Sequence, residues 1–293
     1  MSAATETVSG GSARTARIVI YALLLVLAAV YLLPLYVMLT TSLKPLDEIR
    51  AGDMLALPRQ PSLASWYKAW GEACIGVTCE GIKGYFWNSI KMVVPAVAIS
   101  TILGALNGYV LTKWRFPGHK LVFGLMLFAC FIPFQAVLIP MARVLGIFGL
   151  ANSTAGLIFV HVVYGLGFTT LFFRNYYEAF PDELVKAAMI DGAGFFKIFW
   201  RILLPNSGPI IVVTVIYQFT NIWNDFLFGV SFSSGGASPM TVALNNLVSS
   251  STGVKEYNVD MAAAVFAALP TLLVYIVAGR YFVRGLMAGA VKG

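Results

Sequence analysis

The chain has 293 residues, of which 59% are hydrophobic and only 11% are charged. A soluble domain is typically about a quarter charged, so the composition excludes a chain built of ordinary soluble domains and favours a protein embedded in lipid. The formal net charge of +7 does not indicate nucleic acid binding, because the cytoplasmic loops of membrane proteins carry an excess of Lys and Arg.

The N-terminal residues are rich in Ser, Thr, Gly and Ala, and residues 1–17 are expected to form a disordered cytoplasmic tail. The apolar run that follows, residues 18–39, is longer than the roughly 7–15 residues of a cleavable signal. No small-residue cleavage pattern closes it. We therefore predict that this run is a retained membrane span.

Further apolar runs along the chain are each about long enough to cross a bilayer, which takes roughly 20 residues. Backbone polar groups in lipid must be satisfied within the segment, so these runs are expected to be helices. The predicted fold is all-α and integral to the membrane, with six transmembrane helices in one bundle. Their ranges are residues 18–39, 92–110, 121–142, 157–173, 209–231 and 261–283.

Basic residues gather in the short connections on one side of this predicted bundle. By contrast, the connection between the third and fourth spans holds only Arg143, and the long fifth loop holds only Lys255. Because short cytoplasmic loops carry the excess of Lys and Arg, both termini are expected in the cytoplasm. The basic residues on that side are Lys113, Arg115, Lys120, Arg174, Lys186, Lys197, Arg201, Arg280, Arg284 and Lys292.

Cys74 and Cys79 lie in the first outward loop, within the segment CIGVTC. In an oxidising compartment this spacing could close a small disulfide loop, and two free thiols are an equal alternative. Cys130 lies in the middle of the third predicted span and is expected to be a small apolar filler.

The segment KAAMIDGAGFFKIFWRILLP, residues 186–205, lies in the cytoplasmic fourth loop and predicts two helices separated by Gly192. Acids at Asp182 and Glu183 favour a helix start before it, and Gly192 can take the left-handed conformation that ends a helix. The small side chains of Ala187 and Ala188 are expected to form a flat face that another protein can approach. A loop resting on the lipid interface is the alternative.

The second of these helices has aromatic residues four positions apart, Phe195 with Phe199 and Phe196 with Trp200. This spacing gives an apolar stripe along one side of the helix. We expect the cytoplasmic ends of the membrane spans to cover it.

This segment resembles the cytoplasmic EAA loop of permease subunits in ATP-binding-cassette (ABC) importers. The pattern is EAA, two residues, DGA, and an aromatic-rich helix that ends in Leu-Pro. WNDF at residues 223–226 is similar to the WNEF of carbohydrate-uptake permeases, and the terminal GLMAGAVKG resembles their C-terminal tail. The matching loop residues are Ala187, Ala188, Asp191, Gly192, Ala193, Phe199, Leu204 and Pro205.

The resemblance covers most of the chain from about Tyr31 and points to the maltose-transporter-like family of permeases. It implies a type I ABC importer (MetI-like) fold, with a transmembrane domain over residues 18–293, a core at about 86–284 and a coupling loop at about 181–205. It also implies that loop and tail residues contact a cytoplasmic ATPase. These are Lys186, Ala187, Ala188, Asp191, Gly192 and Ala193, together with Gly289, Ala290, Val291 and Lys292.

Lys186 departs from the family, because it stands where the family has a glutamate. Either an acid on the ATPase compensates for the reversed charge, or Glu183, one helical turn earlier, takes over the contact.

The sequence contains no GxxxxGK[ST] phosphate-binding loop, so we expect a separate subunit to hydrolyse ATP with Mg²⁺ and no cofactor in this chain. No GxSxG nucleophile motif occurs, and the two histidines, His119 and His161, do not suggest a metal site. The resemblance implies a second permease, a homodimeric cytoplasmic ATPase and a periplasmic or lipid-anchored sugar-binding protein in a bacterial or archaeal inner membrane. A secondary transporter or channel subunit driven by an ion gradient is the alternative.

Polar residues within the predicted spans are candidates for the sugar pathway. Sugars are bound through hydrogen bonds from amides and carboxylates with an aromatic face under the ring, and helix–helix hydrogen bonding is the alternative role. His161 also lies within a span, where an ionisable group is costly unless it faces a partner or a cavity. A glucose-type substrate is favoured, on a looser resemblance of the first outward loop. The pathway candidates are Asn221, Trp223, Asn224, Asp225 and Gln135.

Overall fold

The computed structural model describes residues 10–250 and 254–290, and the side chains of residues 14–250 and 254–279. Every regular element within these ranges is a helix. The chain divides into two compact units. One holds the described residues up to Ala69 and those from 254 to Val265, and the other holds Trp70–Ser250 and the described residues from Phe266 onward.

The first unit begins with α1 (Gly10–Ser42), which is followed by α2 (Leu46–Arg50) and α3 (Ala64–Gly71). Residues 10–17 are therefore helical rather than part of a disordered tail. The earlier part of the predicted tail lies outside the described residues. The predicted first span is confirmed, since Arg14–Ser42 is long and apolar enough to cross a membrane.

A buried lysine joins the parts of the first unit. Lys44 is only 1% exposed, and its ammonium donates to the backbone carbonyl of Asp53 at 2.9 Å. Its own carbonyl accepts a hydrogen bond from Asn258 at 3.1 Å. Asn258 lies in the first turn of α13 (Tyr257–Ala290), which contains the predicted sixth span.

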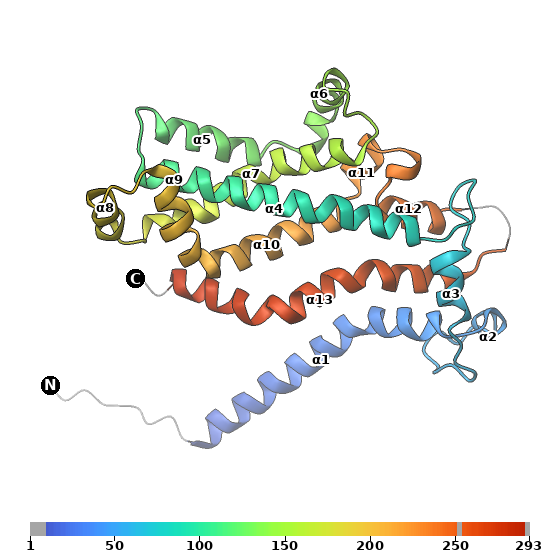
Figure 1. Ribbon diagram of the computed structural model, residues 1–293. Helices are drawn as coiled ribbons and strands as arrows, with labels where there is room; N and C mark the ends of the chain where they lie inside the picture. Colours follow the sequence, from blue (N-terminus) through green and yellow to red (C-terminus); the bar gives the residue numbers. More distant parts are fainter. Residues whose placement is uncertain (1–9, 251–253, 291–293) are drawn as a thin grey trace. The chain divides into compact units, whose positions relative to one another are not determined.

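The second unit is built on two long helices, α4 (Lys83–Lys113) and α7 (Thr154–Glu178), which lie side by side (Figure 1). Gly104 and Gly108 allow this approach. A Cβ at position 104 would overlap the side chain of Thr169, and one at position 108 would lie 2.8 Å from the Cβ of Phe173. Small residues four apart are a common way for membrane helices to pack closely.

The remaining helices of this unit surround that pair. α10 (Gly208–Trp223) packs on α4 and α7, and α5 (His119–Cys130) packs on α7. The other elements are α6 (Phe134–Ile147), α8 (Asp182–Ile190), α9 (Phe195–Ile198), a π-helix (Phe199–Leu203), 3₁₀ turns at Pro205–Ser207 and Gly235–Ala237, α11 (Leu227–Phe232) and α12 (Met240–Val248).

Four helices in the described part of the chain can each cross a membrane alone, and two bent helix pairs bring the number to six if each pair counts as one span. The predicted single helix at residues 121–142 is wrong, because α5 and α6 meet at 106°. Pro133 has no N–H to donate and disfavours helical geometry in the residue before it. Its extended ψ of 135° marks the break.

The predicted fifth span, residues 209–231, is also interrupted. α10 ends at Trp223, and the carboxylate of Asp225 accepts hydrogen bonds from the backbone N–H groups of Phe228 at 3.0 Å and Gly229 at 3.1 Å. These bonds satisfy two of the free N–H groups at the start of α11, although Asp225 lies one residue before the helix cap, Phe226. At its other end, α10 follows the 3₁₀ turn at Pro205–Ser207, and the helical segment Phe195–Leu203 meets Pro205–Trp223 at a bend of 41°.

The structure joins Cys74 and Cys79 in a disulfide. Between them the backbone turns at Gly76, which has a positive φ of 64°. The N–H of Ile75 donates to the carbonyl of Thr78 at 2.8 Å, so the bridge closes a tight hairpin with Val77 exposed at its tip.

We expect the two hairpin thiols to react with a maleimide only after reduction. A Cys130→Ala background leaves them as the only cysteines of the three in the sequence, and mass spectrometry then counts the labels. The bridged protein should take up none before reduction and two afterwards. Labelling without a reductant would contradict the bridge.

Candidate functional site

The predicted coupling loop folds as a helix, a glycine turn and a second helix. The predicted left-handed conformation of Gly192 is confirmed by its φ of 76°. The N–H of Gly192 donates to the carbonyl of Met189 at 3.1 Å, and the N–H of Ala193 donates to that of Ala188 at 2.9 Å. This pair of bonds is the Schellman arrangement that ends a helix at a glycine.

The exposed face of α8 differs from the prediction. Val185 and Ala188 are buried in a core cluster with residues of the second loop helix, whereas Lys186 and Ala187 are exposed. Residues three apart share one side of a helix, so Ala188 turns inward with Val185. The expected flat face of Ala187 and Ala188 is therefore wrong, and Ala187 alone is available to a partner. Of the other predicted contacts, Asp191 and Gly192 are exposed and Ala193 is half-buried.

The second loop helix stacks on the end of α4. The ring of Tyr109 lies 4.8 Å from that of Phe195 and 5.9 Å from that of Phe199, centroid to centroid, with both pairs stacked. One apolar stripe is thus covered by a membrane span, as predicted. Phe196 and Trp200 remain 66% and 51% exposed, so the expectation that the spans cover the aromatic stripe is wrong for this pair, whose rings point away from Tyr109.

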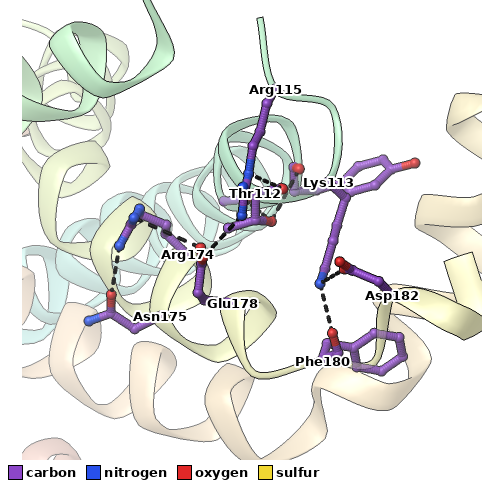
Figure 2. Close-up of polar contacts among 10 residues, drawn as sticks. Thr112, Lys113, Arg115, Arg174, Asn175, Glu178, Phe180 and Asp182 are labelled. Carbon is purple, nitrogen blue, oxygen red and sulfur yellow. Dashed lines mark hydrogen bonds and ion pairs between the residues drawn. The ribbon is translucent and has the colours of Figure 1, made fainter.

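Lys113 at the end of α4 joins this helix to the start of α8 (Figure 2). Its ammonium donates to the carbonyl of Phe180 at 2.7 Å and to the carboxylate of Asp182 at 2.5 Å. The Lys113 side chain is 6% exposed and that of Asp182 is 58% exposed. This hydrogen bond, and then the charge of Lys113, lower the pKa of Asp182. The pair is therefore formed at neutral pH and is lost only as the pH falls through that lowered pKa.

A second ionic group ties the same end of α4 to α7 (Figure 2). Arg115 pairs with Glu178 at 3.0 Å, and Arg174 lies 3.8 Å from the other carboxylate oxygen of Glu178. Lys186 lies beside these cations, where it lines a cavity of about 380 Å³ with Lys113, Arg115 and Asp182 among others. Within the described residues it forms no ion pair.

A second cavity, of about 110 Å³, lies between α7 and α10 and contains two of the predicted pathway residues, Asn221 and Asp225. Asn221 is exposed and its amide donates to the carbonyl of Tyr217 at 2.9 Å. The other residues that line this cavity are Cys130, Phe134, His161, Tyr164, Gly165, Phe168, Tyr217, Gln218, Ile222 and Phe228.

Sequence reasoning did not find Tyr164, Tyr217 and Gln218 as site residues. A signal was present, because His161, Tyr164 and Phe168 recur at the spacing of one helix face, as do Gln218, Asn221 and Asp225. Following each polar residue along its own helix face would have found them.

The other pathway candidates lie elsewhere. Trp223 is 1% exposed, donates its indole N–H to the carbonyl of Ala267 at 2.8 Å and stacks on Phe219, and it does not line the cavity. Asn224 and Gln135 are exposed and do not line the cavity.

Of the predicted C-terminal contacts, Gly289 and Ala290 belong to the last turn of α13. Val291 and Lys292 lie outside the described residues. No group of three or more His, Cys, Asp or Glu side chains that could hold a metal occurs in the part of the chain that the structure describes.

Residues 96–286 match the protein family described as "Binding-protein-dependent transport system inner membrane component". A probable ABC transporter permease of Pyrococcus horikoshii is 41% identical over 278 residues, covering 94% of this chain and 98% of that protein. A xylose/arabinose import permease of Haloferax volcanii is 32% identical over 295 residues, covering 94% of this chain and 93% of that protein.

Among solved structures, one chain of a bacterial ABC transporter involved in the import of the acidic polysaccharide alginate shares the fold. The TM-score is 0.79 at 21% sequence identity, and the alignment covers 96% of this chain and 100% of that chain. The predicted all-α permease fold is thus confirmed. The family match spans more than half of the sequence, and the apolar helices make the protein a multi-pass membrane protein. The chain therefore belongs to the family of inner membrane components of binding-protein-dependent transport systems, the non-catalytic permease subunits of ABC importers.

Proposed function

We propose that this permease subunit carries a sugar across the inner membrane of a bacterial or archaeal cell. The observation that carries the proposal is the cavity between α7 and α10, in which an amide and a carboxylate, Asn221 and Asp225, face aromatic rings. Amide and carboxylate groups can hydrogen-bond sugar hydroxyls while rings cover the apolar face. The sugar-importing relative supports this assignment, and a glucose-type substrate is our preferred choice.

The complex that we propose contains four kinds of subunit. A second permease completes the pathway, a sugar-binding protein delivers the substrate, and two copies of a cytoplasmic ATPase bind ATP and Mg²⁺. The coupling loop and residues 289–292 contact the ATPase, and both termini lie in the cytoplasm. The basic residues at one end of α4 and α7 support this orientation, because the positive-inside rule places such clusters in the cytoplasm.

The contacts of the loop suggest how movement of the ATPase reaches the pathway. Lys113 and Tyr109 fasten the loop to the end of α4. Farther along α4, Ser100 accepts a hydrogen bond from Gln218 of α10 at 2.9 Å, and Gln218 lines the cavity. Movement of the loop would therefore displace helices that form the cavity and shift the population between inward-open and outward-open states.

ATP-dependent uptake tests the proposed function. Proteoliposomes that contain all four kinds of subunit should import labelled D-glucose, D-xylose or maltose when ATP is present on the side of the membrane that holds the ATPase. No ion gradient should be needed. Uptake should stop when ATP is withheld. Uptake that follows an imposed ion gradient without ATP would instead support a secondary transporter, for which the ionisable pair His161 and Asp225, 3.9 Å apart within the bundle, is the supporting observation.

Lys113→Met should weaken the coupling between ATP hydrolysis and uptake. A hydrogen bond to a charged group contributes about 1.5–3 kcal/mol, which the 58% exposure of Asp182 reduces to about 1 kcal/mol. We expect uptake to fall by roughly fivefold while ATP hydrolysis continues. Lys120→Met, at an exposed lysine nearby, is the matched control. Wild-type uptake by Lys113→Met would show that the contact does not transmit movement.

Lys186→Glu should reduce co-purification of the ATPase, because we propose that Lys186 meets an acidic group at the docking surface. The side chain is exposed and forms no ion pair with the described residues, so the substitution should not unfold this chain. Reversing one partner of a desolvated charge pair costs about 2–5 kcal/mol, more than a tenfold loss of affinity. A matched charge reversal on the ATPase should restore assembly. Unchanged assembly would assign the contact to Glu183 or to the backbone.

A further inference from the structure

Two buried polar atoms on α7 form no hydrogen bond with the described residues. His161 is 5% exposed, and its Nε2 forms no hydrogen bond with any described residue. The hydroxyl of Tyr164, three residues further along the helix, is likewise buried and unpaired among the described residues. A buried polar atom without a hydrogen bond is costly, and this cost is greater in a bilayer than in water.

Both residues line the cavity that holds Asn221 and Asp225. Nε2 of His161 lies 3.9 Å from Oδ2 of Asp225, which is longer than a hydrogen bond. Asp225 already accepts from two backbone N–H groups, but a carboxylate has about four acceptor positions. Each of these groups therefore retains capacity for a further partner inside the cavity.

Packing fixes the two rings without using their polar atoms. The ring of Phe228 lies 5.6 Å from that of His161 and 4.9 Å from that of Tyr164. Phe134 packs on both Tyr164 and Phe228. Aromatic contacts thus hold the rings of His161 and Tyr164 in place. These contacts do not use the polar atoms of the two residues, so packing alone does not explain why the atoms are there.

We infer that His161, Tyr164 and Asp225 form a subsite for the hydroxyl groups of a neutral sugar. The inference rests on the proposed function and deepens it by placing direct substrate contacts on this subunit. A hydroxyl both donates and accepts, so it can donate to Asp225 or His161 and accept from Tyr164. The Asp225 carboxylate disfavours an anionic sugar at the same place, because like charges repel most strongly where water is excluded.

The size of the cavity fits one edge of a sugar ring. An engineered cavity of about 150 Å³ takes up a benzene ring, and this cavity has about 110 Å³. One side of a pyranose ring with one or two hydroxyls would enter it, and the remainder of the ring would face Asn221 at its exposed side.

Cys130 supplies a reporter that does not depend on transport, because its thiol lines the same cavity and the other two cysteines of the chain form the disulfide. The assembled complex in lipid nanodiscs, without nucleotide, is treated with a small methanethiosulfonate reagent. The rate at which Cys130 is modified is measured over a range of D-glucose, D-xylose and maltose concentrations. D-Glucuronate serves as the anionic comparison.

We expect at least one neutral sugar to slow the modification of Cys130 and D-glucuronate to have no effect. Tyr164→Phe removes only the hydroxyl and should raise the protecting concentration by about two- to tenfold, the loss of one hydrogen bond. His161→Phe should act in the same direction. Thr101→Val is the matched control, because the Thr101 hydroxyl is also buried and unpaired among the described residues but does not line the cavity.

Equal protection of the wild type and Tyr164→Phe, or no protection by a sugar that the wild-type complex imports, would overturn the subsite. Protection that depends on Tyr164 in a complex that imports none of the three sugars would uphold the subsite and refute the proposed transport instead. Absence of both protection and import would refute both.

Discussion

The second unit depends on the close approach of α4 and α7 at Gly104 and Gly108. Lipid tails are as apolar as the side chains of a membrane helix, so the hydrophobic effect does not drive helices to associate within the bilayer. Packing and hydrogen bonds must hold them together instead. A methyl group at either glycine would overlap the opposite helix, which means that only glycine permits this distance. α5 packs on α7, and α10 packs on both α4 and α7.

The coupling loop and the cavity place their charged groups in different surroundings. At one end of α4, ions are partly exposed and paired, as in Lys113 with Asp182. In the cavity, His161 and Asp225 are largely buried and stand too far apart to satisfy each other. A partly exposed ion pair contributes little free energy, whereas ionisable groups buried within a membrane bundle are costly and usually face a cavity or a partner. Ser100 and Gln218 provide a polar contact from α4 to the helix that lines the cavity.

The amino-acid sequence was sufficient for the helical class, the long spans and the glycine turn of the coupling loop, because each depends on local rules. Hydrophobic length identifies a span, and Gly192 ends a helix through its own conformation. The sequence analysis did not predict the breaks at Pro133 and Asp225, because the length of an apolar run does not indicate whether its helix is continuous or bent. The inward turn of Ala188 and the burial of Trp223 depend on neighbours far away in the sequence. Each lining face could be followed along its own helix, but neither pattern alone shows that the faces of α7 and α10 meet in one cavity.

The π-helix at Phe199–Leu203 has a consequence for how this chain can vary during evolution. A π turn closes its hydrogen bond over one residue more than an α turn and occurs mostly as a single turn within a helix. Because each residue of an α-helix turns the side chains by about 100°, losing one residue here would change the direction in which Gln218 and Asn221 of α10 point relative to the loop. The number of residues in this stretch sets the phase between the loop that carries Gly192 and the face of α10 that lines the cavity. Insertions and deletions between Phe199 and Gly208 would therefore change which side chains of α10 line the cavity.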